Sequence, residues 1–127
     1  MATPFTLSGE LLLPVDPGQP NSSAPFSVVD NFESRVDYEL NYTGSSTEIL
    51  SLGTMPAAGA KAIVLELEFG ATVAPINLRF NGGGSSGQVE VSPGGFFVLA
   101  SPVPAIGVTA ISIVHTTAVK IRLRILG

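Results

Sequence analysis

The sequence predicts an all-β protein, an antiparallel β-sandwich of jelly-roll type with about 8–10 short strands. Apolar and polar residues alternate with period two in many segments, as they do where one face of a strand is buried. Glycine and proline are abundant, at 14 and 10 of the 127 residues, and they cluster in the breaks between those segments. No window has the spacing of an amphipathic helix. Residues 1–127 carry no linker or repeat, and they are predicted to form one β-sandwich domain whose strands stack in two sheets.

Four segments alternate most regularly and predict strands at 36–42, 63–69, 76–81 and 119–125. Weaker alternation predicts six more, at 5–13, 25–30, 48–52, 88–92, 96–100 and 108–115. Gly9 interrupts the first of these and indicates either a bulge or a close approach of backbone. The proline- and serine-rich segment 16–24 is predicted to be a loop.

Charged residues suggest that two distant strands are neighbours. Glu66 and Glu68 lie two positions apart, and so do Arg122 and Arg124. Side by side in one sheet, these strands would form opposite-charge pairs on its outer face. Four independently solvated side chains are the alternative.

The charge balance argues against nucleic acid and membrane partners. The net charge is −4, and the only grouped basic residues alternate along the last strand, so there is no patch to neutralise phosphates. No apolar run approaches the roughly 20 residues of a membrane helix. The first residues lack a basic region followed by an apolar one, so no secretion signal is expected.

Charged residues make up only 13% of the chain, which favours a partner covering part of the exterior.

No pattern for catalysis, a cofactor or a metal is found, and the chain is predicted not to be an enzyme. There is no cysteine, and His115 is the only histidine, on a strand face with Ile111 and Ile113 at the edge of the predicted core. The glycine-rich stretch 81–87 lacks the lysine of a phosphate-binding loop and is expected to connect two strands of a hairpin. No Asp-x-Asp-x-Asp-Gly calcium loop occurs.

A sugar site is also disfavoured. Glu66 and Glu68 could in principle act as acid and base on a glycosidic bond. However, the chain has no tryptophan to stack on a sugar ring, and Tyr38 and Tyr42 lie on an apolar strand face that predicts a core position.

The adjacent pair Phe96 and Phe97 points to an interaction surface. Successive side chains of a strand face opposite sides, so only one of the two rings can enter the core. Val98 and Leu99 continue this two-sided apolar character. We expect the outward side to contact another subunit, with a covering loop as the alternative.

The second half of the chain resembles small β-rich virion proteins of tailed bacteriophages, in particular capsid decoration (cement) proteins and tail-tip or fibre-associated modules. The resemblance covers residues 60–127. It rests on Ala-Pro-Ile-Asn-Leu-Arg-Phe-Asn-Gly-Gly (74–83), Val-Ser-Pro-Gly-Gly-Phe-Phe-Val-Leu-Ala-Ser-Pro (91–102), Gly-Val-Thr-Ala-Ile-Ser-Ile (107–113) and Val-Lys-Ile-Arg-Leu-Arg-Ile-Leu-Gly (119–127).

The resemblance implies a jelly-roll subunit, commonly trimeric, that is made in the host cytoplasm and ends in the virion. Its partner would be the major capsid protein or another virion protein, without cofactor or metal. The interface residues we expect are Phe96, Phe97 and Val98, together with Pro14 and Pro17 in a loop that could reach a neighbour. A tail-tip or fibre-associated protein is the first alternative, and a small carbohydrate-binding β-sandwich module or hydrolase is the second.

Overall fold

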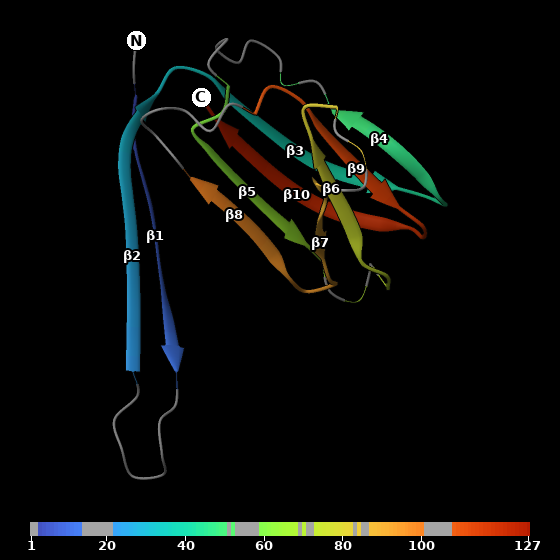
Figure 1. Ribbon diagram of the computed structural model, residues 1–127, viewed down its shortest axis with the longest axis horizontal. Coiled ribbons are helices and arrows are strands. Elements are labelled where there is room, and N and C mark those ends of the chain that lie inside the picture. Colours follow the sequence, from blue (N-terminus) through green and yellow to red (C-terminus); the bar gives the residue numbers. More distant parts are fainter. Residues whose placement is uncertain are drawn as a thin grey trace.

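The structure is a computed structural model that describes residues 3–13, 22–50, 52, 59–68, 70, 73–82, 84, 87–100 and 108–127. Within these residues the chain forms ten strands in three antiparallel sheets (Figure 1). The all-β prediction is confirmed, and each of the ten predicted segments overlaps one of the ten strands.

Two four-stranded sheets make up the sandwich. The first sheet has the order β3 (Arg35–Tyr42), β10 (Val119–Leu126), β5 (Ala62–Leu67) and β8 (Phe96–Ala100). The second has the order β4 (Ser46–Leu50), β9 (Ile111–His115), β6 (Ile76–Phe80) and β7 (Val89–Val91). The third sheet is a hairpin of β1 (Thr3–Leu13) and β2 (Ser22–Phe32).

The sandwich has the jelly-roll topology. β3 pairs with β10, β4 with β9, β5 with β8, and β6 with β7, all antiparallel. Pairing the first strand with the last, and so on inward, is what results when one long hairpin is rolled up into two stacked sheets. The pairing of β10 with β5 joins the four strands of the first sheet, and the pairing of β9 with β6 joins the four strands of the second.

The core lies between the two sheets and follows directly from the alternation in sequence. Along β10, residues alternate between buried and exposed, with Ile121, Leu123 and Ile125 almost completely buried. Ile111 and Ile113 of β9 contribute from the opposite sheet. Burying such a side chain stabilises the fold by about 1.5–3 kcal/mol relative to leaving it in water.

One turn shows how the sequence sets the connections. Ser92-Pro93-Gly94-Gly95 joins β7 to β8, and the Gly95 amide donates to the Ser92 carbonyl over 2.9 Å. Proline fixes its own backbone angle, and Gly94 has a φ of 80°, which a residue with a side chain rarely adopts. The turn therefore ends β7 and reverses the chain into β8.

The first two strands depart from the expectation of two stacked sheets. β1 and β2 pair with each other along their whole length and form an arm, here meaning residues 3–13 and 22–32. The arm runs past the ends of the sandwich strands, and the end of β1 and beginning of β2 lie clear of the sandwich (Figure 1). Residues 22–24, expected in a loop, belong to β2.

Gly9 makes a close approach rather than a bulge. The pairing of β1 with β2 continues without interruption through Gly9, which lies opposite Phe26. The Phe26 ring occupies the space where a Cβ of Gly9 would be. An aromatic ring that covers a glycine on the neighbouring strand is a known way to support such a position.

The base of the arm is tied to the sandwich by polar contacts. The Lys61 ammonium donates to the Asn31 carbonyl over 2.8 Å and lies 3.6 Å from the Asp30 carboxylate. The amides of Glu33 and Ser34 donate to the carbonyl of Gly127 over 2.8 and 2.9 Å. These bonds set the direction in which the arm leaves the sandwich.

Candidate protein-interaction surface

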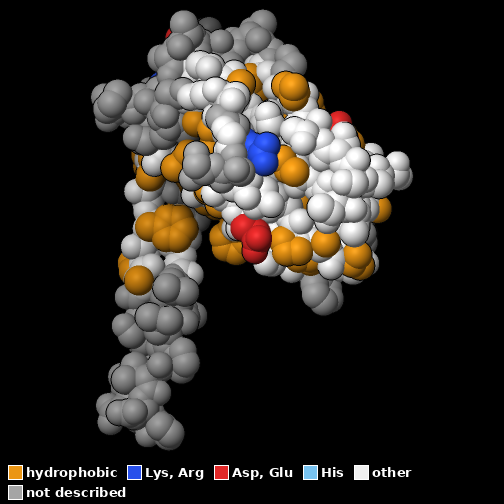
Figure 2. All heavy atoms as spheres, turned by 45° about the vertical axis from the view of Figure 1, so that its right-hand side comes forward, with side chains coloured by type: hydrophobic (Ala, Val, Ile, Leu, Met, Phe, Trp, Pro, Cys, Tyr) orange, Lys and Arg blue, Asp and Glu red, His pale blue; other side chains and the backbone are white. Residues whose placement is uncertain are grey.

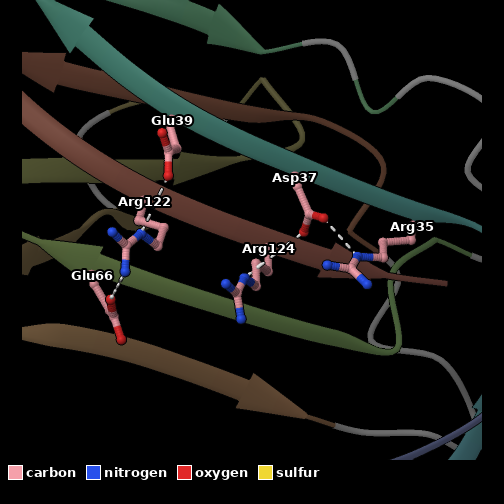
Figure 3. A network of polar contacts seen from close by, with 6 residues as sticks. All are labelled: Arg35, Asp37, Glu39, Glu66, Arg122 and Arg124. Carbon is pink, nitrogen blue, oxygen red and sulfur yellow. Dashed lines mark hydrogen bonds and ion pairs between the residues drawn. The ribbon is translucent and has the colours of Figure 1, made fainter.

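The outer face of the sheet β3-β10-β5-β8 carries a row of paired charges (Figure 3). We call it the charged row; its members are Arg35, Asp37, Glu39, Glu66, Glu68, Lys120, Arg122 and Arg124. Arg122 lies between Glu39 and Glu66, at 3.8 and 3.7 Å. Asp37 lies between Arg35 and Arg124, at 2.6 and 4.0 Å. Each basic member thus faces at least one carboxylate.

The predicted pairing of the two charged strands is confirmed, with one change of partner. β5 and β10 are neighbours, and Arg122 lies directly opposite Glu66. Arg124 lies opposite Val64 and pairs with Asp37 of β3 instead, while Glu68 pairs with Lys120 at 3.5 Å. The difference arises because the register places the second arginine beyond the acidic part of β5.

The charged row carries equal numbers of positive and negative groups, so it does not attract a partner by net charge. Its side chains are about half exposed or more, and ion pairs of this kind contribute about 0–1 kcal/mol each. Four basic groups face four carboxylates, so the row creates little net field. A partner that binds here would be recognised by shape and apolar contact, and the row would mainly fix its register.

An open hollow of about 650 Å³ lies over one end of this face. Its lining includes the charged pairs Glu66 with Arg122 and Glu68 with Lys120, and also Phe96. Glu66 and Glu68, considered above as an acid–base pair, are both engaged with cations. Tyr38 and Tyr42 are partly buried against the core, as predicted, and so do not provide rings for a sugar.

The two adjacent phenylalanines point in opposite directions, as the strand geometry requires. Phe97 packs against the core, and its ring centroid lies 5.8 Å from that of Phe80. Phe96 points outward and is 71% exposed. Val98 and Val64 lie opposite each other on the same outward face. We call Phe96, Val98 and Val64 the β8 patch, after the strand that ends this sheet in the described part of the chain.

The arm presents a second apolar surface. The register places Phe5, Leu7, Phe26, Val28 and Phe32 on one side of the ribbon, which we call the arm face; Asp30, opposite Phe5, lies on the same side. Phe26 is 51% exposed, although such a ring is normally covered. Figure 2 shows hydrophobic side chains along the described part of the arm and on the sandwich across from it, with few charges between them. The expected interface residues Pro14 and Pro17 lie outside the described residues.

A buried polar cluster lies at the end of the sandwich far from the arm. His115, predicted at the edge of the core, ends β9, and its side chain is completely buried. Its Nε2 lies 3.1 Å from Glu48 Oε1, and its Nδ1 lies 2.8 Å from the Gly44 carbonyl and 3.0 Å from that of Thr117. The Tyr42 ring stacks on the imidazole with centroids 5.4 Å apart. The cluster therefore joins β4, β9 and two turns.

The surroundings of His115 favour its charged form. Both ring nitrogens face oxygen acceptors, and only the imidazolium can donate from both. Burial by itself lowers the pKa of His115, but hydrogen bonds to Glu48, Thr117 and Gly44 outweigh it, and the pKa is raised above its ordinary 6.5. Burial also raises the pKa of Tyr42, with Glu48 and Tyr38 adding to it, so its ring stays neutral against the cation. We assign this cluster a structural role.

The stability of the protein is expected to depend on pH through this cluster. Because the pKa of His115 is higher in the folded chain, the stabilisation is complete below pH 6.5 and is lost as pH rises through the raised pKa. Urea unfolding should therefore give free energies of unfolding that fall from pH 6 to pH 9. Unfolding is followed by circular dichroism, because the chain has no tryptophan to report it by fluorescence. His115→Gln should remove most of the slope; an equal slope in that variant would contradict the assignment.

The sequence placed His115 correctly but did not identify its partners. Glu48 shares the inward side of β4 with Leu50, whereas Ile49 between them is 80% exposed. A carboxylate on the apolar side of a strand is the signal that could have been used, since a buried charge needs a partner. The other two acceptors are backbone carbonyls, which no side-chain pattern reveals.

Among the described residues, no group of three or more histidine, cysteine, aspartate or glutamate side chains is placed to hold a metal ion. The same residues include no helix that is long and apolar enough to span a bilayer. Comparisons of the chain with protein-family models, with curated proteins and with solved structures find no match. Function must therefore be inferred from the surfaces themselves.

Proposed function

We propose that this chain is a virion structural protein of a tailed bacteriophage, a capsid decoration protein that binds the assembled shell and stabilises it by protein–protein contacts. The observation that carries the proposal is the arm. Its described strands carry only Glu10 and Asp30 as charged residues, the ring of Phe26 on the arm face is 51% exposed, and two-stranded ribbons are only marginally stable alone in water. We therefore infer that a partner protein covers the arm face when the protein functions.

The rest of the molecule is consistent with this role. The jelly roll supplies a rigid body, the charged row gives a balanced contact face, and the polar cluster around His115 is used to join strands and turns. A protein that binds only the assembled shell stabilises that shell by mass action. The capsid shell is proposed as the partner, in preference to other proteins, because residues 60–127 resemble decoration proteins.

The proposal is tested by locating the protein in the virion. Antibodies against the chain, visualised by gold labelling in electron microscopy, should mark the heads of the phage that encodes it. Purified protein should also cosediment with shells that lack it and raise the temperature at which they open. Label confined to the tail would replace the proposal by the tail-tip or fibre alternative, and absence from virions would overturn both.

A matched pair of variants tests whether the arm makes the contact. Phe26→Glu places a charge on the arm face, where the side chain is 51% exposed, and Ile49→Glu places one at an apolar position on β4 that is 80% exposed. We expect the first variant to weaken cosedimentation with shells by about tenfold or more, because a buried phenylalanine is worth about 1.5–3 kcal/mol, and the second to bind normally. Equal binding by both variants would show that the arm face is not needed.

A further inference from the structure

A hollow of about 300 Å³ lies where the base of the arm meets the sandwich, and we call it the base hollow. Most of its walls are apolar side chains contributed by both parts of the molecule: Phe5, Leu7, Phe32, Ala62, Val64 and Leu126. The space equals that of about ten water molecules in the liquid and is at the lower end of the range of ligand pockets. It is therefore large enough for a small apolar group, whose entry would remove apolar surface from water.

The charged residues that line the base hollow are basic. Within the described part of the chain they are Arg35 and Arg124. Among the same residues, Asp37 is the one carboxylate paired with them, 2.6 Å from Arg35 and 4.0 Å from Arg124. The Asp30 carboxylate belongs to the arm face but is compensated by the Lys61 ammonium at 3.6 Å. Two guanidinium groups that share one carboxylate leave one positive charge beside the hollow.

The charged row is thus balanced as a whole but uneven along its length. At the end next to the arm, two arginines share Asp37. At the other end, two basic residues face three carboxylates, and these five are Lys120, Arg122, Glu39, Glu66 and Glu68. An acidic group is therefore attracted to the end next to the arm and repelled at the other, which fixes where it can bind along the row.

The guanidinium group of Arg124 has hydrogen-bond donors to spare. Its Nε lies 4.0 Å from Asp37 Oδ1, which is too long for a hydrogen bond, and within the described residues this group makes no other. Figure 3 shows it pointing from β10 toward β5, away from Asp37. Val64, in the wall of the base hollow, lies directly opposite on β5. The planar set of N–H donors that matches a carboxylate therefore lies beside an apolar wall.

We propose that the base hollow anchors the shell protein by binding an acidic–apolar segment of it. A carboxylate side chain of that segment binds Arg124 and Arg35, and an adjacent apolar side chain fills the hollow. The arm face continues from the hollow through Val28 to Phe26, so the same segment can extend along it. This inference rests on the proposed function and deepens it, because it names the chemistry of the partner segment and the residues that recognise it.

Cosedimentation of a matched pair of variants with shells tests the anchoring. Arg124→Gln removes the donors at the base hollow, and we expect it to weaken binding by about tenfold or more, because the partner covers this ion pair and shields it from water. Arg79→Gln is the control: it removes the same charge from β6 in the other sheet, where Arg79 donates to Gln88 over 3.2 Å. The control should bind as the native chain does. Native affinity in Arg124→Gln, or an equal loss in both variants, would refute the anchoring.

Octanoate tests the chemistry of the base hollow without shells. It joins a carboxylate to an apolar chain, and octanamide has the same shape without the charge. In NMR titrations of the full chain, we expect octanoate to shift the methyl signals of Val64 and Leu126 and to bind about fivefold or more tightly than octanamide. Arg124→Gln should abolish this difference.

Blocking the site from within gives a second check. Val64→Glu places a carboxylate opposite Arg124, as Glu66 lies opposite Arg122 in the native chain, so the sheet can accommodate it. This variant should lose the preference for octanoate, whereas Val64→Gln should keep it. Equal binding of octanoate and octanamide by the native chain, or signal shifts confined to other residues, would overturn the site.

These outcomes separate from those of the proposed function. A native chain that binds no shells would refute the decoration role and the assignment of the occupant to the shell protein, while the octanoate titration would still decide whether the site exists. Shells that bind the native chain and Arg124→Gln equally well would leave the decoration role in place and refute the anchoring.

Discussion

Replacing His115 with alanine is expected to lower the free energy of unfolding by about 2–4 kcal/mol, a large part of the 5–15 kcal/mol of a typical domain. The imidazole side chain is completely buried, so its removal leaves a cavity. It also removes the donor to two carbonyls and to Glu48, and buried acceptors without a partner cost about 1–3 kcal/mol. Partial access of water to Glu48, which is 29% exposed, keeps the loss below that of a fully buried ion pair.

Thermal unfolding followed by circular dichroism measures this loss. A decrease of 2–4 kcal/mol corresponds to about 7–15 °C in Tm for a chain of this length. Thr116→Ala, at the next and exposed position, is the control and should stay within about 0.5 kcal/mol of the native chain. If His115→Ala were as stable as this control, the cluster would not be joining the strands as described.

The sandwich could be predicted because its strands carry their own evidence of burial. In β10 each inward residue is apolar and each outward residue is charged up to Arg124, so the segment has one stable orientation in a sheet. The opposite charges of Glu66 and Arg122 even identified a long-range pair correctly. Where local pattern and tertiary packing agree, sequence reasoning is reliable.

The arm could not be predicted, because alternation shows that a face is to be covered without showing by what. Residues 5–13 and 25–30 alternate like strands of the sandwich, yet within the described part of the chain they pair only with each other. Sheet membership depends on contacts between residues far apart in the chain, and period two is the same for every pairing. The candidate site followed the same rule: Phe96 was expected at an interface from its own strand, whereas the apolar face of the arm was found only in the structure.

The second large effect is expected in the core, from Leu123→Ala. Leu123 lies in the central part of β10, between Tyr38 of β3 and Leu65 of β5, and is 1% exposed. Removing most of a buried leucine side chain costs about 2–5 kcal/mol, the sum of lost burial and the cavity that remains. We expect a value in the upper half of this range, because both neighbouring strands are fixed by their own pairings and the site has little freedom to collapse.

Arg122→Ala is the matched comparison, because it changes the adjacent residue on the opposite face of the same strand. Arg122 is 57% exposed, and its pairs with Glu39 and Glu66 are solvent-screened, so the loss should stay below about 1 kcal/mol. Urea unfolding of both variants under the same conditions gives the contrast directly. A large loss for Arg122 together with a small one for Leu123 would require β10 to be turned over, with every inward and outward side chain exchanged. The contrast thus tests the register on which the core, the charged row and the β8 patch all depend.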